Sequence, residues 1–356
     1  MKSFKSFPCS LVPVIVLFIF KFSSCASHTS VAKIQTAEFG IHQEWAGMTD
    51  EDIEYKQSMD RSWDKLLSTK AQIQSHLSQN QIEFLPRTVV YPFSGIDVLN
   101  LFSFFPSADN YILFGLEDPG YPSNYSNLTE REKQTFRRGI LSLSEHLAGR
   151  NYFTYRKMKE ETKKRELNGA YPVFVAFLTR MGKTIIDSNE ETIKGPDITY
   201  KGFQLHLYDP KLKRTQKLTY FKIFLTGKEG VAGDGITEYF GSLGPKAVFT
   251  KSAEYLFHGE RRSLFRDLIL KDTDLVVQDE SGFPIRFFPK ETWARKILGR
   301  YEKSWNLSGA VTPEAQKELK ELSDETNNAP LPFPFGYGVL GTKDNKQSAV
   351  LIFQKK

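Results

Sequence analysis

The sequence predicts an α/β fold, with a mixed α+β arrangement as the alternative, in which helices flank a sheet that contains a βαβ unit. An aromatic and β-branched run at 88–93, a short apolar segment at 98–105 and a second run at 110–116 follow the order of strand, helix and strand in a parallel pair. Helical and strand-like patterns then alternate along the chain. In addition, 111–122 resembles 274–284: each has the pattern of a strand followed by two acids, a small residue or Pro, Gly, an aromatic residue and Pro. A duplication into two related units would explain this similarity, and so would the turn-forming chemistry of Gly-aromatic-Pro alone.

Helices are expected where apolar residues recur at three- and four-residue spacing. The first follows a possible cap at Thr49 and extends to Leu77, and Asp97 is placed to cap the segment 98–105. Thr129 and Glu132 have the spacing of a capping box for a helix that continues to Leu147. The other expected helices are 153–167, 252–270, 290–300 and 313–325.

Strands are expected at shorter runs that are rich in β-branched and aromatic residues. A Gly-rich stretch at 227–244 is expected to be a long loop. The expected strands beyond the first pair are 171–179, 202–208 and 218–225, spaced like a meander, then 247–250, 274–278, 285–288, and a closing hairpin of 337–340 with 349–353.

The N-terminus has the pattern of an export signal over residues 1–24. Lys2 and Lys5 precede an apolar run at 11–20 that is too short to span a bilayer comfortably, and small residues surround Cys25. Cleavage before Cys25 would leave this cysteine as the lipid-accepting first residue of a bacterial lipoprotein. Ordinary cleavage nearby followed by secretion, and an uncleaved anchor, are the alternatives.

The rest of the chain divides by composition. Residues 25–44 mix polar and small residues without periodicity and are expected to form a tether. An N-terminal α/β unit with helices is expected over 45–168 and a C-terminal mixed α/β unit over 169–356. These two units are alternatively one continuous domain.

Charge and composition exclude some classes of function. The formal charge of +6 falls to +3 once the three lysines of the signal are removed, because that segment contains no acid, and so nucleic acid is not an expected partner. Aromatic residues make up 13% of the chain, which favours a Phe-rich core. No later apolar run approaches 18 residues, so no membrane span is expected after the signal.

Familiar cofactor motifs are absent. Gly182-Lys183-Thr184 resembles the end of a phosphate-binding loop, but Phe177 stands where that loop needs glycine. Gly95 and Glu117 lack the glycine pattern of a dinucleotide site. The six histidines show no metal-binding spacing, so neither a metal nor another cofactor is expected.

Acidic residues follow the predicted strands and form the candidate cleft together with a serine. Ligands of open α/β sheets bind beyond the carboxyl ends of strands, where paired acids could catalyse glycan cleavage or hold a cation such as calcium. The favoured interpretation is that these acids cap helices and form turns. The candidates are Ser94, Asp97, Glu117, Asp118, Asp279 and Glu280.

Five short motifs are spread along the chain: Tyr91-Pro-Phe-Ser-Gly95 with Asp97, Phe104-Phe105-Pro106, Phe114-Gly-Leu-Glu117, Lys251-Ser252-Ala253, and Gln278-Asp279-Glu280-Ser281-Gly282. With them the chain resembles a family of exported bacterial proteins, many of which carry lipoprotein signals. The resemblance extends over most of the chain after the signal and implies export and a single unit. The family has no assigned activity, so the resemblance implies no catalytic residues.

Three classes of function remain. The favoured one is a lipid-anchored binding or interaction module of the bacterial cell envelope, with an envelope protein or a glycan as its partner. The second is an envelope hydrolase that acts on a glycan or an ester through the carboxylates or Ser94. The third is a purely structural surface protein.

Overall fold

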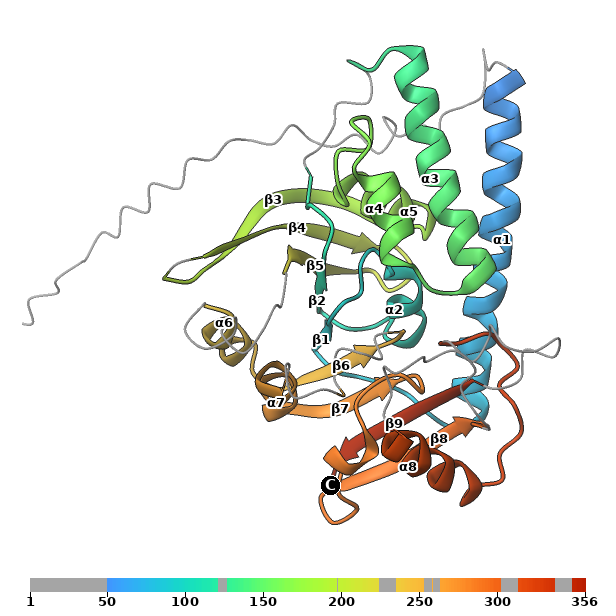
Figure 1. Ribbon diagram of the computed structural model, residues 1–356. Coiled ribbons are helices and arrows are strands. Elements are labelled where there is room, and N and C mark those ends of the chain that lie inside the picture. Colours follow the sequence, from blue (N-terminus) through green and yellow to red (C-terminus); the bar gives the residue numbers. More distant parts are fainter. Residues whose placement is uncertain are drawn as a thin grey trace, which may run out of the picture. The chain divides into compact units, whose positions relative to one another are not determined.

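The protein has a mixed α/β fold, as the sequence predicts (Figure 1). Eight helices and nine strands are described. The computed structural model describes residues 50–120, 127–196, 198–223, 235–252, 258, 263–301, 313–336 and 348–356. The expected signal, Cys25 and tether lie outside these residues.

All nine strands belong to one sheet, in the order β3-β4-β5-β2-β1-β6-β7-β9-β8. The five central strands, β5, β2, β1, β6 and β7, are parallel, and antiparallel strands extend both sides. When these five strands are numbered by their order along the chain, their order across the sheet is 3-2-1-4-5, which is that of a doubly wound sheet. The strands are β1 Thr88–Tyr91, β2 Asn110–Gly115, β3 Thr184–Lys194, β4 Thr199–Asp209, β5 Arg214–Lys222, β6 Lys246–Thr250, β7 Thr273–Gln278, β8 Trp293–Gly299 and β9 Ala349–Lys355.

Helices cover both faces of the sheet because successive strand residues point to opposite sides. Val89 and Tyr91 belong to one hydrophobic core, with side chains of α1 to α5, whereas Val90 belongs to a second core, with α6, α7 and α8. The largest fully buried side chains are all Tyr and Phe, so the expectation of a Phe-rich core is confirmed. The helices are α1 Asp50–Gln79, α2 Val98–Phe104, α3 Glu130–Arg150, α4 Tyr155–Thr162, α5 Tyr171–Arg180, α6 Ile236–Ser242, α7 Ser263–Lys271 and α8 Pro313–Asp324.

Elements with local signals were predicted correctly. The capping box of Thr129 and Glu132 opens α3, and Asp97 caps α2 by accepting a hydrogen bond from the backbone N–H of Asn100. Helices α1 and α8 and strands β6, β7 and β9 match the expected positions, while α4 and α7 are shorter than expected. Residues 253–257, 259–262 and 337–340, which belong to an expected helix and hairpin, lie outside the described part.

Four expectations are wrong. Residues 171–179 form helix α5: they are buried on every side, so periodicity cannot distinguish helix from strand, and Pro172 suits the first helical turn. Residues 290–300 contain strand β8 instead of a helix, and 285–287 form a short 3-10 helix instead of a strand. Helix α6 occupies part of the expected loop 227–244.

Strand β3 is missing from the expectations. It lies at the edge of the sheet and carries many charged and polar residues, so it has no apolar run to detect. Charge on an edge strand prevents pairing with other chains.

The sheet contains strands from both expected units. β1 and β2 come from 45–168, and they pair with β6 and β5 from 169–356. The two similar segments, 111–122 and 274–284, begin in the last strands of two βαβ units, β1-α2-β2 and β6-α7-β7. The first strands of these units, β1 and β6, are neighbours in the sheet. Duplication and the division into units stay predictions.

No helix of the described residues is long and apolar enough to cross a membrane.

Replacing Thr129 by Ala removes the side chain that caps α3. We expect the free energy of unfolding to fall by about 1 kcal/mol, measured by urea denaturation. Thr135→Ala is the matched control, because Thr135 is half-buried on the same helix and its hydroxyl donates to the carbonyl of Arg131 instead of capping the helix. An equal loss in both variants would show that the cap contributes nothing specific.

Candidate functional site

The candidate site lies where the connections of the sheet change direction. β1 crosses through α2 to β2 on one side, whereas β6 crosses through α7 to β7 on the other. Open α/β sheets bind ligands at this switch point, beyond the carboxyl ends of the strands. We call the described loop residues 92–97, 116–120, 251–252 and 279–284 the carboxyl-edge site.

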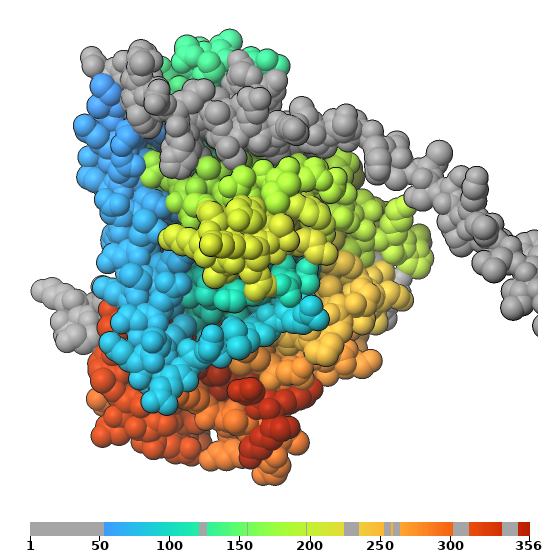
Figure 2. All heavy atoms as spheres, turned by 180° about the vertical axis from the view of Figure 1, so that it is seen from behind, coloured from blue at the N-terminus to red at the C-terminus, as the bar shows by residue number. Residues whose placement is uncertain are grey.

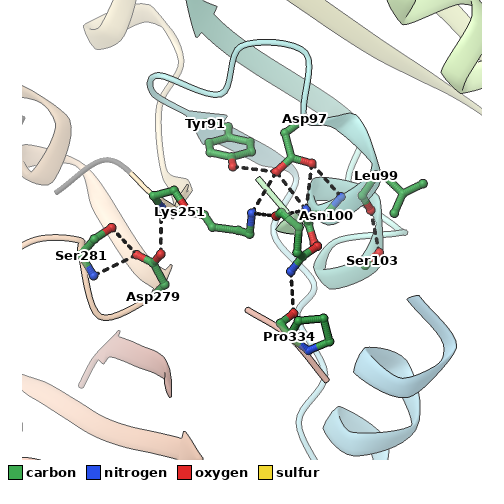
Figure 3. Close-up of polar contacts among 11 residues, drawn as sticks. Tyr91, Asp97, Leu99, Asn100, Ser103, Lys251, Asp279, Ser281 and Pro334 are labelled. Atoms are coloured by element: carbon green, nitrogen blue, oxygen red, sulfur yellow. Dashed lines mark hydrogen bonds and ion pairs between the residues drawn. The ribbon is translucent and has the colours of Figure 1, made fainter. Parts of the chain in front are cut away.

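A buried ion pair spans the switch point. Lys251 directly follows β6, and its Nζ lies 3.5 Å from Oδ2 of Asp97, with side-chain exposures of 0% and 3%. The ammonium also donates a hydrogen bond to the backbone carbonyl of Asn151. Figure 3 shows the Lys251 side chain extended toward Asp97. The pair therefore joins the loop after β6 to the loop after β1 and to the end of α3.

The Asp97 carboxylate is surrounded by donors. The Tyr91 hydroxyl donates to Oδ2 over 3.1 Å, and the Asn100 amide donates to both oxygens over 2.9 and 3.0 Å. The backbone N–H of Asn100 donates to Oδ1 over 3.2 Å. Asp97 is thus a helix cap and the counter-ion of Lys251, and both of its oxygens already accept hydrogen bonds.

Asp279 forms a turn at the end of β7, on the other side of Lys251 (Figure 3). Its carboxylate accepts from the backbone N–H of Ser252 over 2.8 Å and from the backbone N–H and hydroxyl of Ser281 over 3.0 and 2.6 Å. Burial raises the pKa of Asp279, against the effect of these donors and of Lys251. Glu280 is also buried, and its Oε2 lies 3.5 Å from the backbone N of Ala349, which donates to it.

Glu117 differs from these acids because its hydrogen bonds are incomplete. It is 4% exposed, and Oε2 accepts from the backbone N–H of Leu116 over 3.2 Å and from the Tyr220 hydroxyl over 3.3 Å. Oε1 is buried and has no hydrogen-bond partner among the described residues. Burial raises the pKa of Glu117, since the hydrogen bonds do not offset the loss of water.

Two glycines leave space around this carboxylate. A Cβ atom on Gly115 would lie 2.9 Å from Oε2 of Glu117, and one on Gly95 would lie 3.7 Å from it. Gly95 has a φ of +52°, which a side chain would strain. The Met158 thioether of α4 fills the other side of Gly95, because its Sδ would be 2.5 Å from such a Cβ. Met158 therefore packs over the turn beside Glu117.

The other two predicted residues have different surroundings. The Ser94 hydroxyl donates to the backbone carbonyls of Gly95 over 3.0 Å and Phe114 over 3.3 Å, which fastens the loop to β2. Asp118 is exposed and forms an ion pair with Lys222. Of the six predicted residues, only Asp118 is exposed. Asp97 forms an ion pair with Lys251, whereas Glu117 accepts from the Tyr220 hydroxyl.

Sequence reasoning missed several residues that shape this edge. Lys251 is part of a motif in the sequence analysis but has no role there. A cation directly after an apolar strand is the signal by which Lys251 could have been identified as a site residue. Thr250 and His258 each have a buried polar atom without a partner in the described part of the chain, and nothing in their spacing indicates this. Burial lowers the pKa of His258, whose Nε2 lies 2.8 Å from the carbonyl oxygen of Gly282.

Nothing in the described residues indicates a metal centre, since no group of three His, Cys, Asp or Glu residues is placed to hold an ion. No protein-family model matches the chain, and no curated protein is significantly similar to it. The class of the protein therefore rests on its fold and on the carboxyl-edge site.

Replacing Lys251 by Met leaves the buried Asp97 without its counter-ion. We expect a loss of about 3 kcal/mol or more in the free energy of unfolding, measured by urea denaturation. The double variant Lys251→Met, Asp97→Asn should recover part of this loss, because the unpaired charge is gone.

The matched control for this prediction is Lys290→Met, which breaks an ion pair with Glu325 on the surface. It should change stability by less than about 0.5 kcal/mol. A loss below 1 kcal/mol for Lys251→Met would contradict the structural importance of the buried pair.

Proposed function

We propose that the protein is a binding module of the bacterial cell envelope and that its carboxyl-edge site takes a hydroxyl-bearing ligand such as a glycan. The observation that carries this proposal is the Glu117 carboxylate, which has one buried oxygen without a partner in the described structure. It lies at the edge where doubly wound sheets bind ligands.

Hydrogen-bond chemistry favours this class of ligand. A buried carboxylate oxygen without a donor destabilises the folded protein, so a donor brought by a ligand is stabilising. A sugar supplies hydroxyl donors, and bonds to an ionised acceptor are about twice as strong as those between neutral groups. The proposed role of Glu117 is to accept hydrogen bonds from ligand hydroxyls through Oε1.

The proposal assigns Met158 the role of covering Glu117. The side chain of Met158 is 7% exposed and packs over Gly95. Methionine has three rotatable bonds and adapts to irregular spaces, so a rotamer change can open this contact at low cost. In this proposal, α4 covers the ligand and Met158 adjusts to it.

A glycan hydrolase is the second candidate, because burial raises the pKa of both Glu117 and Asp279. A raised carboxyl pKa suits a general acid. Ser94 is a poor nucleophile here, since its hydroxyl donates to two backbone carbonyls. The test is an assay with nitrophenyl glycosides as substrates. Release of nitrophenol by the wild type, and no release by Glu117→Gln, would favour the hydrolase over the binding module.

The proposal includes the location. We propose that Cys25 carries a lipid and that residues 25–44 tether the folded part to an envelope membrane, with an envelope glycan or protein as partner. Support comes from the sequence: a positive end, an apolar core and small residues around a cysteine. A diacyl group anchors a protein durably, whereas one acyl chain does not.

Glu117→Gln should change how stability depends on pH. Because burial raises the pKa of Glu117 above its ordinary value of 4.5, the folded protein holds this proton to higher pH than the unfolded chain. As pH rises from 4.5 through the pKa that Glu117 has in the folded protein, ionisation of Glu117 therefore lowers the free energy of unfolding. Above that folded-state pKa the free energy of unfolding stays lowered by this amount. Urea denaturation across this range should show the variant gaining stability relative to the wild type as pH rises.

The same variant tests binding. Isothermal titration with a panel of neutral saccharides and a peptidoglycan disaccharide should give about tenfold weaker binding for Glu117→Gln than for the wild type. Glu314→Gln is the matched control, because Glu314 is exposed on α8 outside the carboxyl-edge site, and it should bind as the wild type does. Met158→Ala should bind more tightly. Absence of binding in both the wild type and Met158→Ala would contradict the glycan proposal and favour a structural protein.

Cys25→Ser should release the protein from the membrane. The wild type is expected in the detergent phase of a Triton X-114 separation, and the variant in the aqueous phase, because the serine cannot accept the thioether-linked lipid. Ser24→Ala is the control for changes near the cleavage site and should stay in the detergent phase. Equal partition of Cys25→Ser and wild type would contradict lipidation.

A further inference from the structure

A second feature lies at the opposite edge of the sheet, where the parallel strands begin. Residues 210–213, which connect β4 to β5, are exposed, and they include Lys211 and Lys213. Arg87, directly before β1, has a side chain that is 90% exposed. Figure 2 shows the yellow β4–β5 hairpin and the cyan segment that leads into β1 on the same face, with a teal segment between them. The cations at the starts of β1 and β5 therefore belong to one surface.

One aspartate joins the two parts of this surface. Asp109, directly before β2, accepts from Nε of Arg87 through Oδ2 over 3.4 Å and forms an ion pair with Arg214 through Oδ1. Its backbone N–H donates to the carbonyl of Arg87 over 3.0 Å, and its carbonyl accepts from the N–H of Lys217 over 2.8 Å. The segment before β1 and the start of β5 are thereby fixed on either side of β2.

Positive charge exceeds negative charge on this surface. Segments 83–87 and 210–214, together with Asp109, contain four cations and two acids. The cations are Arg87, Lys211, Lys213 and Arg214, and the acids are Glu83 and Asp109. Asp209, directly before the turn, adds no free negative charge because it forms an ion pair with the buried Lys183. The excess of cations attracts anionic groups.

Two exposed leucines accompany these cations. Leu85 is 69% exposed and Leu212 is 40% exposed. Each stands two positions before one of the arginines that share Asp109, so each lies before the first residue of its strand. The turn that carries Leu212 is fixed, because the backbone N–H groups of Lys211 and Leu212 donate to Oδ1 of Asp209 over 2.8 and 3.2 Å. We call Leu85, Arg87 and residues 211–214 the amino-edge surface.

The chemistry of this surface matches an anionic lipid bilayer. Proteins that rest on membranes combine apolar side chains, which enter the boundary between headgroups and acyl chains, with Lys and Arg, which attract anionic lipids. A soluble polyanion would match the cations but would leave Leu85 and Leu212 in water. A bilayer matches both, because it offers phosphate groups and an apolar layer directly beneath them.

We propose that the amino-edge surface docks on a bilayer that contains anionic phospholipids. The lysines and arginines contact lipid phosphates, and Leu85 and Leu212 enter the boundary between headgroups and acyl chains. Docking directs the carboxyl-edge site away from the bilayer, because that site lies at the other end of the parallel strands. The inference goes beyond the proposed function and needs neither a ligand at the carboxyl-edge site nor a lipid on Cys25.

Sedimentation with vesicles of phosphatidylglycerol and phosphatidylcholine in equal parts tests the proposal. The full chain carries Cys25→Ser throughout, so no covalent lipid contributes and every variant has the same N-terminus. Lys211→Gln with Lys213→Gln should lower the partition coefficient roughly tenfold or more, since each cation near an anionic surface contributes about fivefold. Leu85→Ser with Leu212→Ser should lower it roughly threefold or more, because two apolar contacts with the bilayer are lost.

The matched control is Lys163→Gln with Lys201→Gln, which removes the same charge from two exposed positions outside the amino-edge surface and should leave partition unchanged. An equal loss in both lysine pairs would overturn the proposal, because net charge and not one surface would then govern binding. Unchanged partition after the change of Lys211 and Lys213, with folding verified by circular dichroism, would also overturn it. A loss in that variant without any loss in the leucine variant would indicate a soluble polyanion as the partner instead of a bilayer.

Discussion

The buried ion pair between Lys251 and Asp97 is the constraint on which the centre of the structure depends. An ammonium group with 0% exposure is tolerable only with a counter-ion and hydrogen-bond acceptors around it. Asp97 and the carbonyl of Asn151 meet this requirement, and Asn151 in turn donates through its side-chain amide to the carbonyl of Pro334. The loops after β1, α3 and β6 and the segment before Gly336 are thereby held in one arrangement.

The carboxyl-edge acids show how one sequence pattern leads to different roles. Each follows a strand, but Asp97 and Asp279 accept several hydrogen bonds from nearby donors, whereas Glu117 keeps one buried oxygen without a partner in the described structure. A saturated carboxylate stabilises its own turn, and an unsaturated one offers an acceptor to a ligand. This difference is the physical basis for giving Asp97 and Asp279 a structural role and for proposing a binding role for Glu117.

The two edges of the sheet differ in their side chains. Several buried carboxylates lie at the carboxyl edge, whereas the amino edge has the buried ion pair of Lys183 with Asp209 and a cavity whose lining is partly polar and includes Glu83. The two edges are separated by a sheet whose buried aromatic side chains pack on both faces, for example Phe249 against Tyr91 and Phe114 against Phe240. Such close packing resists deformation of the sheet between its two edges.

The sequence by itself determined the elements whose signals are local: the caps at Asp97 and Thr129, the parallel pair of β1 and β2 and the placement of acids after strands. The tertiary structure alone decided that the buried run at 171–180 is a helix and that the charged β3 joins the sheet edge, because apolar periodicity is uninformative in both. It also decided the contacts of the site. Lys251 and Asp97 are 154 positions apart and Tyr220 and Glu117 are 103 apart, and a pairing over such separations is set by the order of strands in the sheet, which no local pattern encodes.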